Sequence, residues 1–87
     1  MAKYRKKPVI IEAFRYGIEE PPDWFRGVDG VWETVEYGTP IKWCEIMTPE
    51  GKMRGERGDW IIRGIQGELY PCKNEIFEQT YELVEEN

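Results

Sequence analysis

Glycine and proline recur so often along this chain that they limit the length of every helix and strand it can form. Nine glycines and six prolines occur within 87 residues, so most connections between elements are tight. A chain of this length makes one small domain, and nearly all of its apolar residues are needed for a single core. We therefore expect residues 1–87 to form one domain of short elements, with little apolar surface left to line a deep pocket.

Segments rich in β-branched and aromatic residues predict most of the secondary structure as strands. The densest run, Trp-Ile-Ile-Arg at residues 60–63, is the expected central strand. Asp29-Gly30 favours a hairpin turn, and Pro49 to Gly51 suits a second reversal. The candidate strand segments are residues 3–14, 32–37, 41–48, 52–55, 60–63, 68–72 and 81–84.

Two short helices complete the expected fold. Prolines at 21 and 22 stand where a helix can begin, and Gly27 stands where one can stop. Asn74 is a good N-cap for a second helix that reaches Gln79 and turns Ile76 and Phe77 inward. The fold class is therefore α+β: a single small domain with a mostly antiparallel sheet of four to six short strands and two short helices.

The composition excludes most enzyme chemistry. Histidine is absent, which removes the commonest general base and metal ligand. Cys44 and Cys72 lack the spacing of redox or zinc motifs, and we expect both to be reduced. No glycine-rich phosphate loop or paired-carboxylate motif stands out. We expect a protein that is not an enzyme, with no catalytic residues, no metal and no cofactor.

Charge and hydropathy limit the classes of binding partner and the cellular compartment that we expect. Twelve basic against 17 acidic residues give a net charge of −5, which argues against a protein that coats nucleic acid. No apolar run has the length of a membrane span or signal peptide, so we expect a cytoplasmic protein. Residues 82–87 form an acidic C-terminal tail. The basic group at residues 3–7 suits nucleic-acid contact, or protection of an edge strand against aggregation.

Aromatic residues in the middle of the chain are the first candidates for a binding surface. The chain has four tryptophans, and tryptophan is enriched both in cores and at interface anchors. Those at 43 and 60 lie in strong strands and are expected to be buried. The loop-rich segment 15–45 suits partner contacts, and a small second cluster under the loop is the alternative. The candidate partner-binding residues are Trp24, Phe25, Trp32 and Tyr37.

A second candidate site lies near the end of the chain. Arg63 follows an apolar run and precedes Gly64, so its guanidinium suits a phosphate or carboxylate. It equally suits solvent, or an ion pair with Glu68 across the next turn. With Tyr70 and Lys73, Arg63 forms a candidate site for a nucleotide-type ligand held between subunits of an oligomer. Asp59 favours a structural role, with its side chain bonding nearby backbone N–H groups.

Three stretches of the sequence carry a family resemblance. Residues 4–14 open Tyr-Arg-Lys-Lys-Pro, residues 58–64 read Gly-Asp-Trp-Ile-Ile-Arg-Gly, and residues 67–73 read Gly-Glu-Leu-Tyr-Pro-Cys-Lys, with Ile-Phe-Glu following at 76–78. This pattern resembles a family of small uncharacterised bacteriophage and prophage proteins. The family usually has proline where this chain has Arg57 and Asn74, and the resemblance misses the variable segment 15–45.

The resemblance implies a phage-encoded protein made in the host bacterial cytoplasm, and it implies no activity. Combined with the aromatic segment, it predicts an accessory protein that binds a host protein and inhibits a defence or regulatory complex. The alternative is an oligomer that sequesters a nucleotide-type small ligand. Nucleic-acid and membrane partners are not expected.

Overall fold

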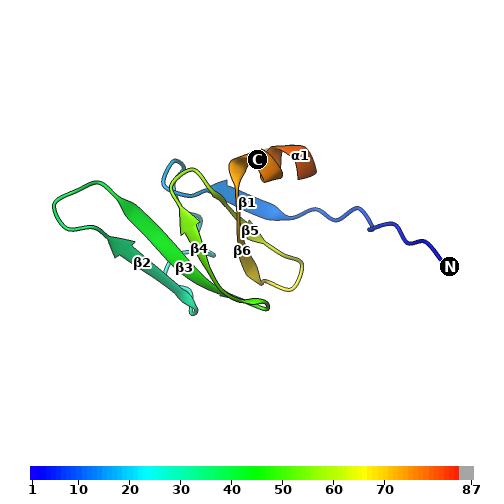
Figure 1. The fold of residues 1–87 in the computed structure, drawn as a ribbon, viewed down its shortest axis with the longest axis horizontal. Helices are drawn as coiled ribbons and strands as arrows, with labels where there is room; N and C mark the ends of the chain where they lie inside the picture. Colours follow the sequence, from blue (N-terminus) through cyan, green and yellow to red (C-terminus); the bar gives the residue numbers. More distant parts are fainter. Residues whose placement is uncertain (85–87) are drawn as a thin grey trace.

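The protein folds into two antiparallel three-stranded sheets and one short helix (Figure 1), in a computed structural model that describes residues 1–84. Sheet A has the strand order β1-β5-β6, and sheet B has the order β2-β3-β4. The elements are β1 (Glu12–Arg15), β2 (Val31–Val35), β3 (Lys42–Thr48), β4 (Gly51–Glu56), β5 (Trp60–Arg63), β6 (Leu69–Cys72) and α1 (Asn74–Thr80).

Strand β5 is the centre of sheet A, as its sequence predicts. It pairs with β1 in a register that places Phe14 opposite Ile61, and with β6 in a register that places Ile61 opposite Pro71. Side chains alternate between the two faces of a strand, so these three share one face. That face looks toward sheet B and carries the core.

The core lies between the two sheets. Ile61 from sheet A and Cys44 from sheet B are fully buried. The sheets approach closely at Gly55 of β4, where an added Cβ would lie 3.0 Å from Cys44 Sγ and 3.3 Å from Ile61 Cδ1. The main core cluster consists of Phe14, Tyr16, Phe25, Cys44, Ile46, Ile61 and Leu69.

Helix α1 covers the other face of sheet A. The ring of Trp60 stacks on Phe77 with centroids 4.1 Å apart and planes 5° apart, and Phe77 stacks on Tyr81. Trp60 Nε1 donates a hydrogen bond to Asn74 Oδ1 at 2.8 Å. The expectation that Asn74 is the N-cap is wrong: it is the first residue of α1, and its side chain binds the indole instead of capping the helix. Lys73 is the N-cap, without a side-chain capping bond.

Two expectations about the architecture are wrong. The strands divide into two sheets rather than one sheet of four to six strands. Residues 19–27 form turns rather than a helix: the N–H of Phe25 donates to Pro22 O at 3.0 Å, and the N–H of Arg26 donates to Asp23 O. A helix this short does not offset the cost of its first turn, and burial of Phe25 fixes the turn instead.

The ends of the chain also differ from expectation. The strand expected over residues 3–14 begins only at Glu12, because β5 ends at the register partner of Glu12, which is Arg63. The strand expected at 81–84 is absent, and Ile76, expected to point inward, is exposed. The acidic tail expected at 82–87 lies partly outside the described residues.

Candidate binding surface

The β2–β3 hairpin extends beyond sheet A at one end of the molecule (Figure 1). Its ladder continues past β2, because the N–H of Glu36 donates to Ile41 O at 2.9 Å. Four residues close the loop, with Gly38 at a φ of +76° that glycine adopts at little cost. Thr39 Oγ1 donates to Glu36 O and accepts from the N–H of Ile41. The loop is thus held by its own hydrogen bonds.

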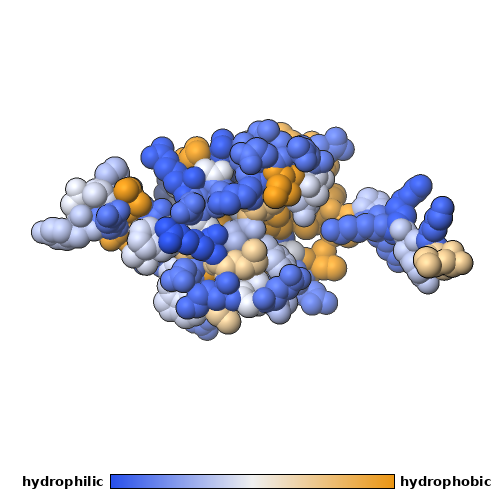
Figure 2. Space-filling view, in the orientation of Figure 1, coloured by the Kyte–Doolittle hydropathy of each residue, from blue (hydrophilic) through white to orange (hydrophobic). Residues whose placement is uncertain are grey.

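Large apolar side chains stand exposed on this hairpin, and Figure 2 shows apolar side chains at its end. Trp32 is 52% exposed and Tyr37 is fully exposed. We call the exposed apolar residues of the hairpin the hairpin surface: Trp32, Val35, Tyr37, Ile41 and Met47. Trp32 and Met47 lie on one face of sheet B and Val35 lies on the other, so this surface wraps around the hairpin.

The four residues proposed from sequence divide between this surface and the core. Trp32 and Tyr37 lie on the hairpin surface. Trp24 is half-buried, with its ring edge-on to Phe14 at 5.6 Å between centroids. Phe25 is only 3% exposed and packs on the same ring at 4.9 Å. Phe25 is therefore a core residue, since a partner cannot reach its side chain.

Cations cover two tryptophans on the outer face of sheet B. Lys52 Nζ lies 5.6 Å from the ring centroid of Trp32, and the Arg54 guanidinium lies 4.3 Å from that of Trp43. Trp43, expected to be buried, is only half-buried because it lies on this outer face with the Arg54 guanidinium over its ring. Trp60, also expected to be buried, is likewise half-buried. Sequence reasoning missed Lys52 and Arg54, because only the β3–β4 register, Glu45 opposite Arg54, brings them to these rings.

A hollow of about 390 Å³ lies beside the hairpin surface. Three cations line it together with a single carboxylate, Glu56, which binds Arg54 at 3.2 Å. Arg57 has no ion-pair partner within residues 1–84. The lining residues are Tyr16, Gly17, Pro40, Ile41, Lys42, Trp43, Arg54, Glu56 and Arg57.

A hydrogen-bonded group in which Tyr16 is buried and Glu33 and Lys42 are partly exposed supports the floor of this hollow. Tyr16 Oη donates to Glu33 Oε2 at 2.8 Å, and Lys42 Nζ binds the same oxygen at 2.9 Å. Burial and the bond to Glu33 raise the pKa of Tyr16. Burial alone would raise the pKa of Glu33, but the bonds from Lys42 and Tyr16 outweigh it and lower that pKa. Glu33 is therefore ionised at neutral pH and holds Lys42 at the rim.

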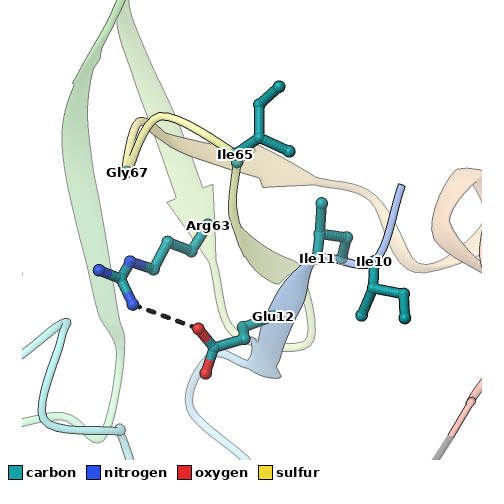
Figure 3. A pocket seen from close by; sticks show the side chains of 7 residues that line it. Ile10, Ile11, Glu12, Arg63, Ile65 and Gly67 are labelled. Atoms are coloured by element: carbon teal, nitrogen blue, oxygen red, sulfur yellow. Dashed lines mark hydrogen bonds and ion pairs between the residues drawn. The ribbon is translucent and has the colours of Figure 1, made fainter. Parts of the chain in front are cut away.

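The second group proposed from sequence does not form one site. Arg63 Nη1 pairs with Glu12 Oε1 at 3.2 Å (Figure 3), not with Glu68. Lys73 Nζ pairs with Asp59 Oδ2 at 3.0 Å. The two cations lie at opposite ends of β5–β6, and their backbone positions are about 13 Å apart at the strand rise per residue. Tyr70 is half-buried between them.

Asp59 has the structural role that the sequence favours. Its Oδ2 accepts from the N–H of Glu56 at 2.9 Å, as well as from Lys73. The bond from Asp59 raises the pKa of Lys73. Cys44 and Cys72 are unpaired, and burial raises the pKa of Cys44 to about 11. A thiol with that pKa is protonated at neutral pH and unreactive.

Comparison with known proteins finds no matching family model, no matching curated protein and no matching solved structure. Over residues 1–84, helix α1 is far shorter than a membrane-spanning helix, and no other helix is present.

Proposed function

We propose that this chain is a binding protein rather than an enzyme: a phage-encoded accessory protein of the host bacterial cytoplasm that captures a host protein. The complex it forms would inhibit a defence or regulatory assembly. The observation that carries the proposal is the hairpin surface, where Trp32 and Tyr37 stand exposed on a segment extending beyond the core. The phage origin rests on the sequence resemblance alone.

Exposed aromatic side chains on a rigid support have the properties of interface anchors. Tryptophan and tyrosine dominate the binding energy of many interfaces because they bury a large area at a small entropic cost. Here the loop hydrogen bonds fix Tyr37, and β3 supports Trp32 through its pairing with Glu45. A standard interface needs about 800 Å² on each partner, which a hairpin and its flanks can supply.

The free edge of β2 adds to this surface. In sheet B only one side of β2 is paired, so its other side presents backbone N–H and C=O groups to a partner strand. Val35, the last residue of β2, and Ile41, just before β3, are exposed apolar residues. A partner that adds a strand here would gain backbone bonds and apolar burial together.

We expect Trp32→Ala and Tyr37→Ala each to weaken capture of the host protein by about 30-fold, the loss typical of an interface anchor. The measurement is the Kd of the purified, stoichiometric complex. Tyr4→Ala is the matched control, because Tyr4 is equally exposed and lies far along the chain in the N-terminal segment. The proposal would be contradicted if both hairpin variants bound the host protein with the wild-type Kd while Tyr4→Ala weakened binding.

The hollow beside the hairpin favours a second candidate function, the sequestration of a nucleotide-type ligand. Lys42, Arg54 and Arg57 suit a phosphate, and Ile41 with Trp43 suits a planar base. This location replaces the Arg63, Tyr70 and Lys73 group, whose two cations lie at opposite ends of β5–β6 and both bind internal carboxylates. Lys42 and Arg54 are also paired, with Glu33 and Glu56, but the hollow adds Arg57, which has no ion pair within residues 1–84. The ligand would be a nucleoside phosphate that sits partly open to solvent.

For this candidate we expect nucleoside monophosphates to raise the melting temperature while the parent nucleosides do not. Arg57→Ala removes the shift, because Arg57 is the cation of the hollow without an ion pair in the described chain. Arg63→Ala is the control and keeps it. Loss of the shift in Arg63→Ala alone would place the ligand at the end of sheet A instead.

A further inference from the structure

The N-terminal arm, residues 1–11, has the sequence of a strand but no partner strand within residues 1–84. It leaves sheet A as an extended segment (Figure 1). Val9 is 44% exposed and Ile10 is 76% exposed. Beside its root lies an open hollow of about 380 Å³, lined by Ile10, Ile11 and Ile65 on one side of the Arg63–Glu12 ion pair (Figure 3). β-branched residues in such a position are typical of a strand whose partner is another chain.

The hydrogen bonds of β1 reveal which backbone groups face outward. The N–H of Tyr16 donates to Asp59 O at 2.7 Å, and Tyr16 O accepts from the N–H of Gly58. Because directions alternate along a strand, residues 12 and 14 also point toward β5, whereas 11, 13 and 15 point away. The N–H of Arg15 indeed bonds Glu19 Oε1 at 2.7 Å, on the outer side. Ala13 and Ile11 thus present free backbone groups.

The same alternation explains how the arm tolerates Pro8. Proline lacks an N–H and is excluded from a ladder position that must donate. Pro8 shares its direction with Ile10 and Glu12, the inward side, where β5 has already ended. The N–H that Pro8 lacks would therefore not have pointed to the outer edge of the arm, so its absence removes no donor from that edge. Val9, Ile11 and Ala13 form an uninterrupted outward row of donors and acceptors.

We propose that two copies of this chain form a two-fold dimer by antiparallel pairing of this row. Ile11 of one copy lies opposite Ile11 of the other. Val9 of each copy lies opposite Ala13 of the other copy. A contact that uses the same patch on both subunits closes at two copies. The two A sheets then join into one continuous sheet, and the exposed side chain of Val9 and the half-buried side chain of Ile11 pack across the two-fold axis.

Charge favours a second copy of this acidic chain as the occupant. Residues 3–7 carry four cations and no carboxylate, while the whole chain has a net charge of −5. Antiparallel pairing carries this basic segment past Arg15 of the second copy, toward Glu19 and Glu20 in the following turn. In this register Lys7 of one copy lies opposite Arg15 of the other, and these two residues carry the same charge. The carboxylate of Glu19, which accepts a hydrogen bond from the backbone N–H of Arg15, compensates for this repulsion.

Protection of an edge strand does not account for the basic group. Residues 3–7 lie outside β1, so their charges do not cover the free backbone groups of Ala13. Nucleic-acid contact would use the cations but leaves the apolar Val9 and Ile10 unexplained. Pairing with a second copy uses the apolar residues, the free edge and the cations together.

Size-exclusion chromatography with light scattering tests the dimer directly. We expect twice the chain mass for the wild type at micromolar concentration. Val9→Pro and Ile11→Pro each remove an outward N–H and give the monomer mass. Ile10→Pro is the matched control, because its N–H points inward beyond the end of β5, and it keeps the dimer. None of these positions lies within β1–β5 pairing.

Circular dichroism of each variant establishes that the domain stays folded, and Val9→Pro, in the exposed arm, preserves the fold even where Ile11→Pro disturbs it. A wild type that is monomeric up to about 100 µM, a dimer that survives Val9→Pro and Ile11→Pro, or a dimer lost equally in Ile10→Pro would each overturn the proposal. A monomer that associates only when an oligonucleotide is added would overturn it as well.

Discussion

Ile61→Ala is expected to lower the free energy of unfolding by about 2–5 kcal/mol, the range for truncating a buried isoleucine to alanine. Ile61 has no exposed surface and stands at the centre of sheet A, opposite Phe14 on one strand and Pro71 on the other. Its Cδ1 also reaches the other sheet near Gly55. The cavity left by truncation is therefore bounded by two sheets that cannot collapse into it. Chemical denaturation measures the loss.

Ile65→Ala is the control for this experiment. Ile65 lies in the turn after β5 and is 73% exposed, so its truncation should change stability by no more than about 0.5 kcal/mol. A domain of this size has a total stability of several kcal/mol. Ile61→Ala therefore leaves it close to unfolding at 37 °C. Equal effects of the two substitutions would mean that the core does not lie between the sheets.

The strands that could be predicted from sequence are those with strong local signals. The run at 60–63 is β5, residues 41–48 contain β3, and Asn74 begins α1. In each case β-branched residues or a polar N-terminal residue agree with the tertiary structure. In these segments the local secondary-structure propensity and the tertiary packing favour the same structure, so the sequence predicts them correctly.

The division into two sheets could not be read from local patterns. It depends on which strands pair, and the sequence of β4 gives little indication: its central residues are Met53, Arg54 and Gly55. The absence of a side chain at Gly55 lets the two sheets approach each other. This close approach is a property of the tertiary structure, so local sequence patterns do not predict it. Phe25 was misassigned for the same reason, because a loop aromatic is equally suited to a core and to an interface until its neighbours are known.

The candidate surface was predicted in part. Trp32 and Tyr37 were singled out from sequence, and both are exposed on the hairpin. Lys52 and Arg54, which lie over the two tryptophans of the outer face, depend on the β3–β4 register. The cations of the hollow come from β3, β4 and the turn after β4, so no single segment of the sequence predicts that they lie together.

Gly55→Val is expected to lower the free energy of unfolding by about 1–3 kcal/mol, the cost of overpacking a filled core. Even a single Cβ here would lie 3.0 Å from Cys44 Sγ, 3.3 Å from Ile61 Cδ1 and 3.4 Å from Pro71 Cβ. Two of these atoms belong to sheet A and one to sheet B, so the larger side chain wedges the sheets apart. The melting temperature and denaturation midpoint both report the loss.

A double-mutant cycle separates lack of space from backbone effects. Gly55 is not at a positive φ, so the cost of Gly55→Ala comes from its neighbours, chiefly Cys44 Sγ. Removing that sulfur with Cys44→Ala makes room for the new methyl group, and the double variant is expected to lose less stability than the sum of the two single losses. Strictly additive losses would mean that the added methyl group does not press on Cys44 Sγ, its cross-strand neighbour in sheet B. Gly27→Ala, with open space around it but a φ of +64°, shows the backbone penalty alone, and that penalty should not respond to Cys44→Ala.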